Sequence, residues 1–313
     1  MISSKCSLRI SLAGGSTDLQ EFVDSNGYGA VISFPCDLYT YINLFRDKNG
    51  YNSFYNKYIV NYTVREEVET AKDVKNDIAR EVLSYFNCEP ANISFNADIF
   101  SEGSGLASSS AYLIACIKAV SAYKKVALSE FDVCSLALEL ERKFNPLTGY
   151  QDIYGCGVSG FKKINFYKDN KVKVEYLNSS FLNCFDMYLL YTGIKRKSTE
   201  LLTSLDLEKV GKILPLVDEI ERSINNLDVE YFLDIIREGW MRKKETSPMI
   251  TSNKIISEMD QIISEDESVL AHRLCGAGNG GYFLLFKKRG SPNNLKNCFR
   301  IKMAEQAVTC KSI

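Results

Sequence analysis

The 313-residue sequence has one histidine and no Cys-x-x-Cys pair among its ten cysteines. These absences exclude the common zinc-binding patterns, which need cysteine and histidine ligands at short, regular spacings. The formal net charge is only −1, so the chain lacks the basic excess that attracts nucleic acid or an anionic membrane. We therefore expect no nucleic-acid partner and no membrane partner, and we expect scattered cysteines that stay reduced.

Long apolar runs are also missing. No stretch approaches the ~20 residues that a helix needs to cross a bilayer, and the N-terminus has no basic-then-apolar secretory pattern. We expect a soluble, cytoplasmic protein. Because the chain is long for a single hydrophobic core, we expect two domains, 1–180 and 181–313.

Local patterns predict a mixture of strands and helices, and hence an α+β fold. Residues 29–46 and 51–64 are rich in β-branched and aromatic residues and flank a turn at 47–50, which predicts a hairpin. Further strands are expected at 7–13, 93–99, 157–177 (as a strand–turn–strand) and 185–191, and after the glycines of 275–281. Helices are expected at 66–86, 108–124, 130–144 (with a capping box at Ser129), 199–224, 228–246 and 253–264.

A run of glycine and serine, GSGLASSSA at 103–111, leads directly into the apolar helix expected at 108–124. A helix N-terminus carries unpaired N–H groups and a partial positive charge, and nearby glycines let the backbone approach a phosphate closely. The Gly-Lys-Ser/Thr of a Walker A loop is absent. The run by itself fits either a phosphate cradle or a capped loop before a core helix.

Two distant segments favour the phosphate cradle: RISLAGGSTD at 9–18 and CGAGNGG at 275–281. Together with 103–111, they resemble the three signature motifs of the GHMP kinase superfamily, which includes galactokinase, homoserine kinase and mevalonate kinase. The sequence departs from these motifs at three positions. Ser101 replaces a proline, Ala107 replaces a usual glycine, and Asn279 stands where glycine is common.

The resemblance implies the two-domain GHMP kinase fold, with an N-terminal ribosomal-protein-S5-like domain and a C-terminal ferredoxin-like domain. It implies that ATP and Mg²⁺ are used. The residues it assigns to ATP binding are Gly103, Ser104, Gly105, Leu106, Ala107, Ser108, Ser109, Ser110, Gly276 and Gly278.

The resemblance also assigns the reacting groups. Ser109 and Glu141 match the magnesium ligands, with Glu139 as a competing choice, and Asp152, eleven residues after Glu141, matches the catalytic base. Arg9 matches an arginine that supports the base. Outside this context, Glu141 would read as a surface helix residue and Asp152 as a turn residue.

The substrate side falls in the first motif and in a basic run. Asp18 matches a carboxylate that binds sugar hydroxyls, although it could also cap a helix that begins just after it. The small residues Gly15, Ser16 and Thr17 leave room for a large sugar. A run of three basic side chains could clamp a substrate phosphate: Lys195, Arg196 and Lys197.

Three segments are similar to D-glycero-D-manno-heptose 7-phosphate kinases: RIS-x-AGG-x-TD, YTGIKRKSTELL at 191–202, and the segment with Trp240, Lys243 and Lys244. This resemblance implies phosphorylation of the anomeric hydroxyl of a sugar phosphate, in the synthesis of GDP-heptose for bacterial surface polysaccharide. A kinase for a fucose-like or galactose-like sugar and a non-catalytic sugar-binding regulator remain alternatives. The sequence leaves the exact sugar, the anomer and a homodimeric state open.

Overall fold

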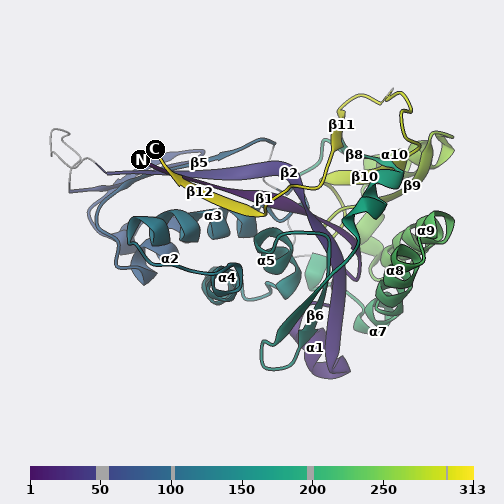
Figure 1. The fold of residues 1–313 in the computed structure, drawn as a ribbon, viewed down its shortest axis with the longest axis horizontal. Coiled ribbons are helices and arrows are strands. Elements are labelled where there is room, and N and C mark those ends of the chain that lie inside the picture. Colours follow the sequence, from purple (N-terminus) through teal and green to yellow (C-terminus); the bar gives the residue numbers. More distant parts are fainter. Residues whose placement is uncertain (47–55, 100–102, 196–200, 294) are drawn as a thin grey trace.

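The computed structural model describes residues 1–46, 56–99, 103–195, 201–293 and 295–313. Within these ranges the strands form one eight-stranded and one four-stranded sheet, and helices pack against both (Figure 1). None of the helices in the described ranges is long and apolar enough to cross a bilayer. None of the ten cysteines, all of which are described, forms a disulfide.

The large sheet has the order β12-β1-β2-β5-β3-β4, and β6 and β7 extend it from β2. Its strands are β1 (Ile2–Ala13), β2 (Tyr28–Phe45), β3 (Tyr58–Asn61), β4 (Arg65–Val68), β5 (Asn92–Ala97), β6 (Lys162–Tyr167), β7 (Val172–Tyr176) and β12 (Val308–Ser312). The long antiparallel pair of β1 and β2 forms its centre. The four-stranded sheet has the order β11-β8-β10-β9, and its strands are β8 (Asp186–Tyr191), β9 (Val269–Leu274), β10 (Tyr282–Lys287) and β11 (Cys298–Ile301).

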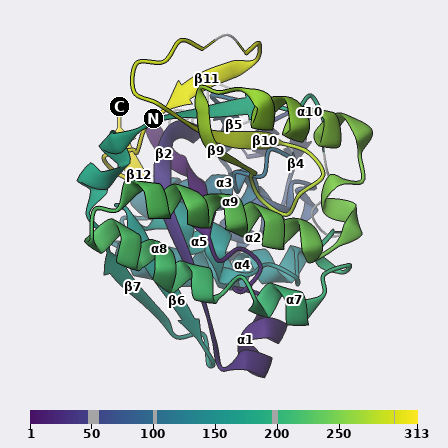
Figure 2. The ribbon, with the colours of Figure 1, turned by 90° about the vertical axis from the view of Figure 1, so that its right-hand side faces the viewer.

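The helices divide between the two sheets. Those on the large sheet are α1 (Gln20–Asn26), the 3-10 turn η1 (Ala71–Asp73), α2 (Asp77–Tyr85), α3 (Ser108–Tyr123), α4 (Glu130–Phe144) and α5 (Tyr150–Gly157). Those in the second half are η2 (Ser179–Cys184), α7 (Leu207–Gly211), α8 (Pro215–Asn225), α9 (Val229–Glu245), η3 (Pro248–Thr251) and α10 (Lys254–Glu265). Figure 2 shows α8 and α9 side by side, with the four-stranded sheet close to α9.

Helix α3 is the central helix of the first half. It is apolar on all sides and buried along most of its length, as expected for a helix enclosed by other elements. It packs on β1 and β2, while α2, α4 and α5 pack against it (Figure 1). The N-terminus of α3 is therefore held rigidly at the end of the sequence run 103–111.

Several elements expected from the sequence are confirmed. Helices α3 and α4 and strands β5 to β8 and β10 lie where the patterns predicted them. The capping box is present, because the Ser129 hydroxyl accepts from the Asp132 N–H and the Asp132 carboxylate accepts from the Ser129 N–H.

The predicted hairpin between 29–46 and 51–64 is wrong. Strand β5 inserts between β2 and β3, and it pairs antiparallel with the first and parallel with the second. The predicted helix at 66–86 is also wrong in its first half, where β4 pairs with β3, and only the α2 part is helical. Local composition could not reveal the insertion of β5, because β5 is distant in the sequence from both of its partners. Strand β4, in contrast, pairs with β3 across a short turn at 62–64, and the helical pattern that begins at 66 hid it.

The chain returns to the large sheet at its C-terminus. Strand β12 pairs antiparallel with β1, so that Ile2 faces Ser312, and the two ends lie side by side (Figure 1). The division into domains 1–180 and 181–313 stays a prediction, but this last strand belongs to the first sheet. A single hydrophobic cluster also runs from β1 and α3 through α8 and α9 to β8 and β10, so the two halves share one core.

Removal of residues 308–313 should lower the melting temperature by several degrees and promote aggregation. The deletion leaves the edge of β1 without its ladder partner and exposes part of the core beneath. Thermal unfolding and light scattering measure both effects, and removal of Ile313 alone is the control. An unchanged melting temperature after the longer deletion would show that β12 adds nothing to the large sheet.

Candidate active site

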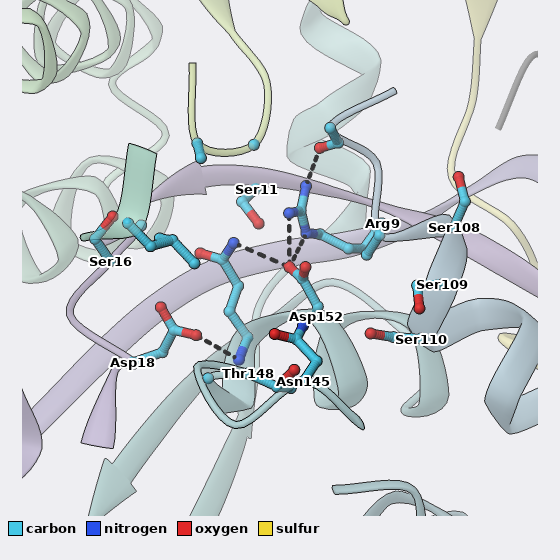
Figure 3. Close-up of a pocket in the computed structure, with 18 of the residues that line it drawn as sticks. Arg9, Ser11, Ser16, Asp18, Ser108, Ser109, Ser110, Asn145, Thr148 and Asp152 are labelled. Atoms are coloured by element: carbon cyan, nitrogen blue, oxygen red, sulfur yellow. Dashed lines mark hydrogen bonds and ion pairs between the residues drawn. The ribbon is translucent and has the colours of Figure 1, made fainter. Parts of the chain in front are cut away.

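A cavity of about 430 Å³ lies where β1, the loop before α3, the end of α4, the start of α5 and the loop after β9 meet. Figure 3 shows the side chains around it. Ser108, Ser109 and Ser110 lie on one side of Asp152, and Ser16 and Asp18 lie on the other. The sequence motifs that are far apart along the chain therefore line one space.

The loop before α3 has the geometry of an anion cradle. Gly103, Gly105 and Ala107 have φ values of 67°, 79° and 65°, which turn the backbone into the helix start at Ser108. No side chain caps the first N–H groups of α3, so they stay available to a phosphate. Ala107 adopts the left-handed conformation that the usual glycine would adopt at lower cost.

Not every predicted nucleotide contact lines the cavity. Gly103, Ser104, Gly105 and the residues from Ala107 to Ser110 do so, as does Gly276. The Leu106 side chain is instead buried in the core, and Gly278 packs against Ile250. Leu106 and Gly278 are therefore not among the residues that line the cavity, and their contacts with the nucleotide stay predictions. Ser101 lies outside the described residues.

The third motif packs directly on the phosphate loop. Gly281 has φ +88°, and a Cβ on it would lie only 2.2 Å from the Ser104 carbonyl oxygen. Only glycine permits this approach. The contact attaches the loop after β9 to the loop before α3, and it explains why the motif ends in glycine.

Arg9 joins the phosphate loop to the predicted base. Its Nε and Nη2 donate to Oδ1 of Asp152 at 3.0 and 2.6 Å, and its Nη1 donates to the Gly105 carbonyl at 2.7 Å (Figure 3). The Arg9 side chain is almost fully buried, whereas that of Asp152 is 41% exposed toward the cavity. Burial alone would lower the pKa of Arg9, but the adjacent Asp152 outweighs it and raises the pKa above its ordinary value.

Glu141 is a buried carboxylate at the wall of the cavity. It accepts a hydrogen bond from the Ser110 hydroxyl at 2.8 Å. Burial raises its pKa to about 7, the Ser110 bond opposes this rise, and the charge of Asp152 adds to it. Among the described residues, Glu141 forms no ion pair. Its negative charge could therefore be neutralised by a cation bound in the cavity.

Ser109 and Glu141 fit a magnesium site. Mg²⁺ takes few ligands from protein and completes its shell with phosphate and water, so a hydroxyl and a carboxylate suffice. Ser109 lines the cavity and is exposed to it. Glu139, the competing choice, is an exposed side chain 4.0 Å from Lys143, away from the cavity. Across the described residues no cluster of three or more histidine, cysteine or acidic side chains forms a larger metal site.

Asp18 lies on the opposite side of the cavity from the α3 serines. It is buried, and its Oδ2 accepts from the Gln151 N–H at 2.9 Å. It does not cap α1, because the N-cap position is Leu19 and no side chain bonds there. Burial raises the pKa of Asp18 to about 6, with the charge of Asp152 adding to the rise.

Of the small residues expected to contact the substrate, Gly15 and Ser16 line the cavity. Thr17 does not line the cavity: it is fully buried, and its hydroxyl lies 2.6 and 2.8 Å from the carbonyls of Gly14 and Ala30, where it supports the turn. Its contact with the substrate stays a prediction. Lys195 is exposed and does not line the cavity, and Arg196 and Lys197 lie outside the described residues.

The sequence analysis missed several side chains that line the cavity: Ser11, Thr148, Gln151, Lys243 and Arg273. Two of them had a signal in the sequence. Ser11 is two residues after Arg9 and therefore shares its face of the strand, and Gln151 immediately precedes Asp152. Lys243 belongs to a segment that carried part of the resemblance, although no role was assigned to it. No local signal marks Arg273. The tertiary fold brings the two residues to the cavity from α9 and β9.

Residues 69–160 match the family described as the GHMP kinases N terminal domain. This range contains the phosphate loop, Glu141 and Asp152. The two sheets, their covering helices and the assembled motifs form the GHMP kinase fold. Residues 69–160 thus match an N-terminal domain of the GHMP kinases, and the match, the fold and the kinase-named relative together support an ATP-dependent sugar kinase.

Within this class the chain is similar to a D-glycero-alpha-D-manno-heptose 7-phosphate kinase of Campylobacter jejuni. The two are 26% identical, and the match covers 96% of this chain and 93% of the relative. A crystal structure of a D-glycero-D-manno-heptose 1-phosphate kinase from Bacteroides thetaiotaomicron superimposes with a TM-score of 0.79 at 19% identity, covering 100% of this chain and 99% of that one. The mevalonate kinase of Methanococcus jannaschii has a TM-score of 0.71 at 18% identity, covering 97% of this chain and 98% of that one.

Replacing Glu141 by glutamine should raise the melting temperature of the ligand-free protein at pH 8. The pKa of Glu141 is about 7 when folded against 4.5 ordinarily, so the folded state holds the proton more tightly. Stability therefore falls as the pH rises between these values. The neutral amide avoids a cost on the order of 1–3 kcal/mol at pH 8, and no gain remains near pH 4.5.

Thermal unfolding of wild type and Glu141→Gln between pH 4.5 and 8 measures this difference. Glu139→Gln, an exposed change two residues away on the same helix, is the matched control and should show no such pH-dependent gain. A Glu141→Gln protein that is no more stable than wild type at pH 8 would contradict the assignment of a buried, uncompensated carboxylate.

Proposed function

We propose that the protein transfers the γ-phosphoryl group of ATP to the anomeric hydroxyl of D-glycero-D-manno-heptose 7-phosphate, to give the 1,7-bisphosphate for GDP-heptose synthesis. The observation that carries the proposal is the Arg9–Asp152 pair, which lies between the phosphate loop and the Asp18 side of the cavity. The names of two relatives support the sugar class, although one names a 7-phosphate and the other a 1-phosphate.

ATP would place its phosphates on the backbone of the loop before α3. The uncapped N–H groups at Ser108 and beyond would donate to the phosphate oxygens, and the helix dipole would favour their charge. Ser109 and Glu141 would hold Mg²⁺, which neutralises charge on the phosphates when bound. The loop is supported by α3 and by Gly281, so it needs little reorganisation.

Asp152 would take the proton from the attacking hydroxyl. Its Oδ1 already accepts two hydrogen bonds from Arg9, so the carboxylate is fixed in orientation. Asp18, which lies on the other side of Asp152 from the α3 serines, would accept hydrogen bonds from sugar hydroxyls. In phosphoryl transfer, this positioning contributes more than covalent chemistry does.

Fewer observations support the two alternative functions. A kinase for a fucose-like or galactose-like sugar would use the same Arg9, Asp152 and Glu141, so only the substrate separates it from the proposal. A non-catalytic sugar-binding regulator would not need to keep a buried arginine bonded to both the base and the phosphate loop. The complete Arg9–Asp152–Gly105 link therefore favours an enzyme.

An ATP-consumption assay with free sugars and sugar phosphates tests the proposal. Heptose 7-phosphate should be turned over with the highest kcat/KM, and the new phosphate should be found on C1. Asp152→Asn should lower kcat by about 100-fold or more with a nearly unchanged KM for ATP, because it removes the base and leaves the phosphate loop intact.

Asp234→Asn, an exposed aspartate on α9, is the matched control and should behave as wild type. Turnover of a free hexose without turnover of heptose 7-phosphate would overturn the substrate assignment. Near-normal kcat in Asp152→Asn would overturn the assignment of the base, whatever the substrate.

A further inference from the structure

Buried polar atoms without a partner gather at the cavity. Among the described residues, five buried side-chain atoms have no hydrogen-bond partner: Oγ of Ser11, Oγ of Ser33, Oγ1 of Thr148, Oε1 of Gln151 and Nε of Arg273. All but Ser33 belong to residues that line the one cavity. Leaving such atoms unpaired destabilises a protein, so their concentration at one place indicates a polar ligand that pairs with them.

Arg273 is a buried cation that lines the cavity and has no carboxylate partner among the described residues. Arg9 pairs with Asp152, and Lys163 pairs with Asp218 and Glu221, whereas Arg273 forms no ion pair within the described ranges. One of its Nη atoms donates to the Leu12 carbonyl, which fixes the guanidinium in place and leaves the Nε–H without a partner. Burial lowers its pKa to about 10, and the charge of Arg9 adds to this, so Arg273 is still charged at neutral pH.

A second cation lies beside Arg273. Lys243, from α9, donates to the carbonyl of Leu274, the last residue of β9, and to that of Gly276 in the loop that follows. Both cations line the main cavity and, together with Gly15, a small hollow next to it. The cavity is therefore positive near Gly15 and the loop after β9, and acidic near Asp18 and Asp152.

We infer that Arg273, with Lys243 beside it, binds the phosphate that the sugar substrate carries before the reaction. A phosphate pairs well with a fixed guanidinium edge, whereas Asp18 and Asp152 repel it. The phosphates of ATP have a separate site on the uncapped start of α3. The inference rests on the proposed function in taking the substrate to be a sugar phosphate.

The uncharged side chains with an unpartnered atom in the cavity, those of Ser11, Thr148 and Gln151, fit the hydroxyl-bearing part of the same substrate. Oε1 of Gln151 can only accept, and it lies 3.5 Å from the position of a Cβ on Gly15, next to the cationic region. The hydroxyls of Ser11 and Thr148 can donate or accept. The sugar's hydroxyls supply these partners, and its phosphate supplies the partner of Arg273. This assignment moves the phosphate clamp from the exposed Lys195 to the buried end of β9.

Steady-state kinetics of Arg273→Gln test the inference. The KM for the sugar phosphate should rise by about 10- to 100-fold, while the KM for ATP changes little. Turnover of the same sugar without its phosphate should be unaffected. The ratio of kcat/KM for the phosphorylated sugar to that for the free sugar should therefore fall. A merely structural role of Arg273 would alter both sugars equally.

Arg237→Gln is the matched control, because Arg237 also donates to a main-chain carbonyl, that of Leu270, but lies on the exposed side of α9. Arg273→Lys keeps the charge without the guanidinium edge, and its KM for the sugar phosphate should be intermediate. If Arg273→Gln fails to fold, Arg273→Lys carries the test, and a wild-type KM for the sugar phosphate then overturns the inference.

A rise in the KM for ATP alone would assign Arg273 to the nucleotide and overturn the inference. The inference also fails if replacing Lys195, Arg196 and Lys197 by glutamine raises the KM for the sugar phosphate while Arg273→Gln does not. If the wild type prefers a different sugar phosphate, the proposed substrate fails and the test is repeated with that compound. A wild-type preference for unphosphorylated sugars would refute the inference.

Discussion

The site depends on the position of one buried guanidinium. Arg9, on the central strand β1, donates to the carbonyl of Gly105 in the phosphate loop and twice to the carboxylate of Asp152 on α5. Its own N–H donates to the Leu106 carbonyl. One residue thereby fixes the distance and orientation between the loop that would bind ATP and the carboxylate that would accept a proton. A shift of either element would leave a buried charge without its partners, which is costly.

The remainder of the cavity supplies charge of opposite sign at separate places. The start of α3 and the Arg273–Lys243 pair are positive, while Glu141, Asp152 and Asp18 are acidic. With the proposed substrates, this separation would let ATP and a sugar phosphate bind with their reacting ends together at Asp152 and their other phosphates apart. The apolar helix α3 and the close approach of Gly281 to the loop keep these groups in register.

Much of the site was predictable from the sequence, because three motifs with glycine and serine in fixed order require the backbone geometry that the structure has. Helix α3 was predictable from its apolar content, and α4 from the capping box at Ser129. The pairing of β5 between β2 and β3 was not, since strand order depends on partners far along the chain. The position of Arg273 could not be predicted from the sequence either, because only the tertiary fold shows that this cation from β9 is buried without a carboxylate.

The most direct test of the account is chemical rescue of Arg9→Ala with guanidinium. The account predicts that kcat falls by about 100-fold or more while the KM values for ATP and the sugar phosphate change little, since the lost groups position the base. Millimolar guanidinium chloride should restore part of kcat, and methylammonium chloride at the same concentration should not, because only the planar fork can bond both Asp152 and Gly105. A kcat in Arg9→Ala close to that of wild type, without added guanidinium, would contradict the central role of this link.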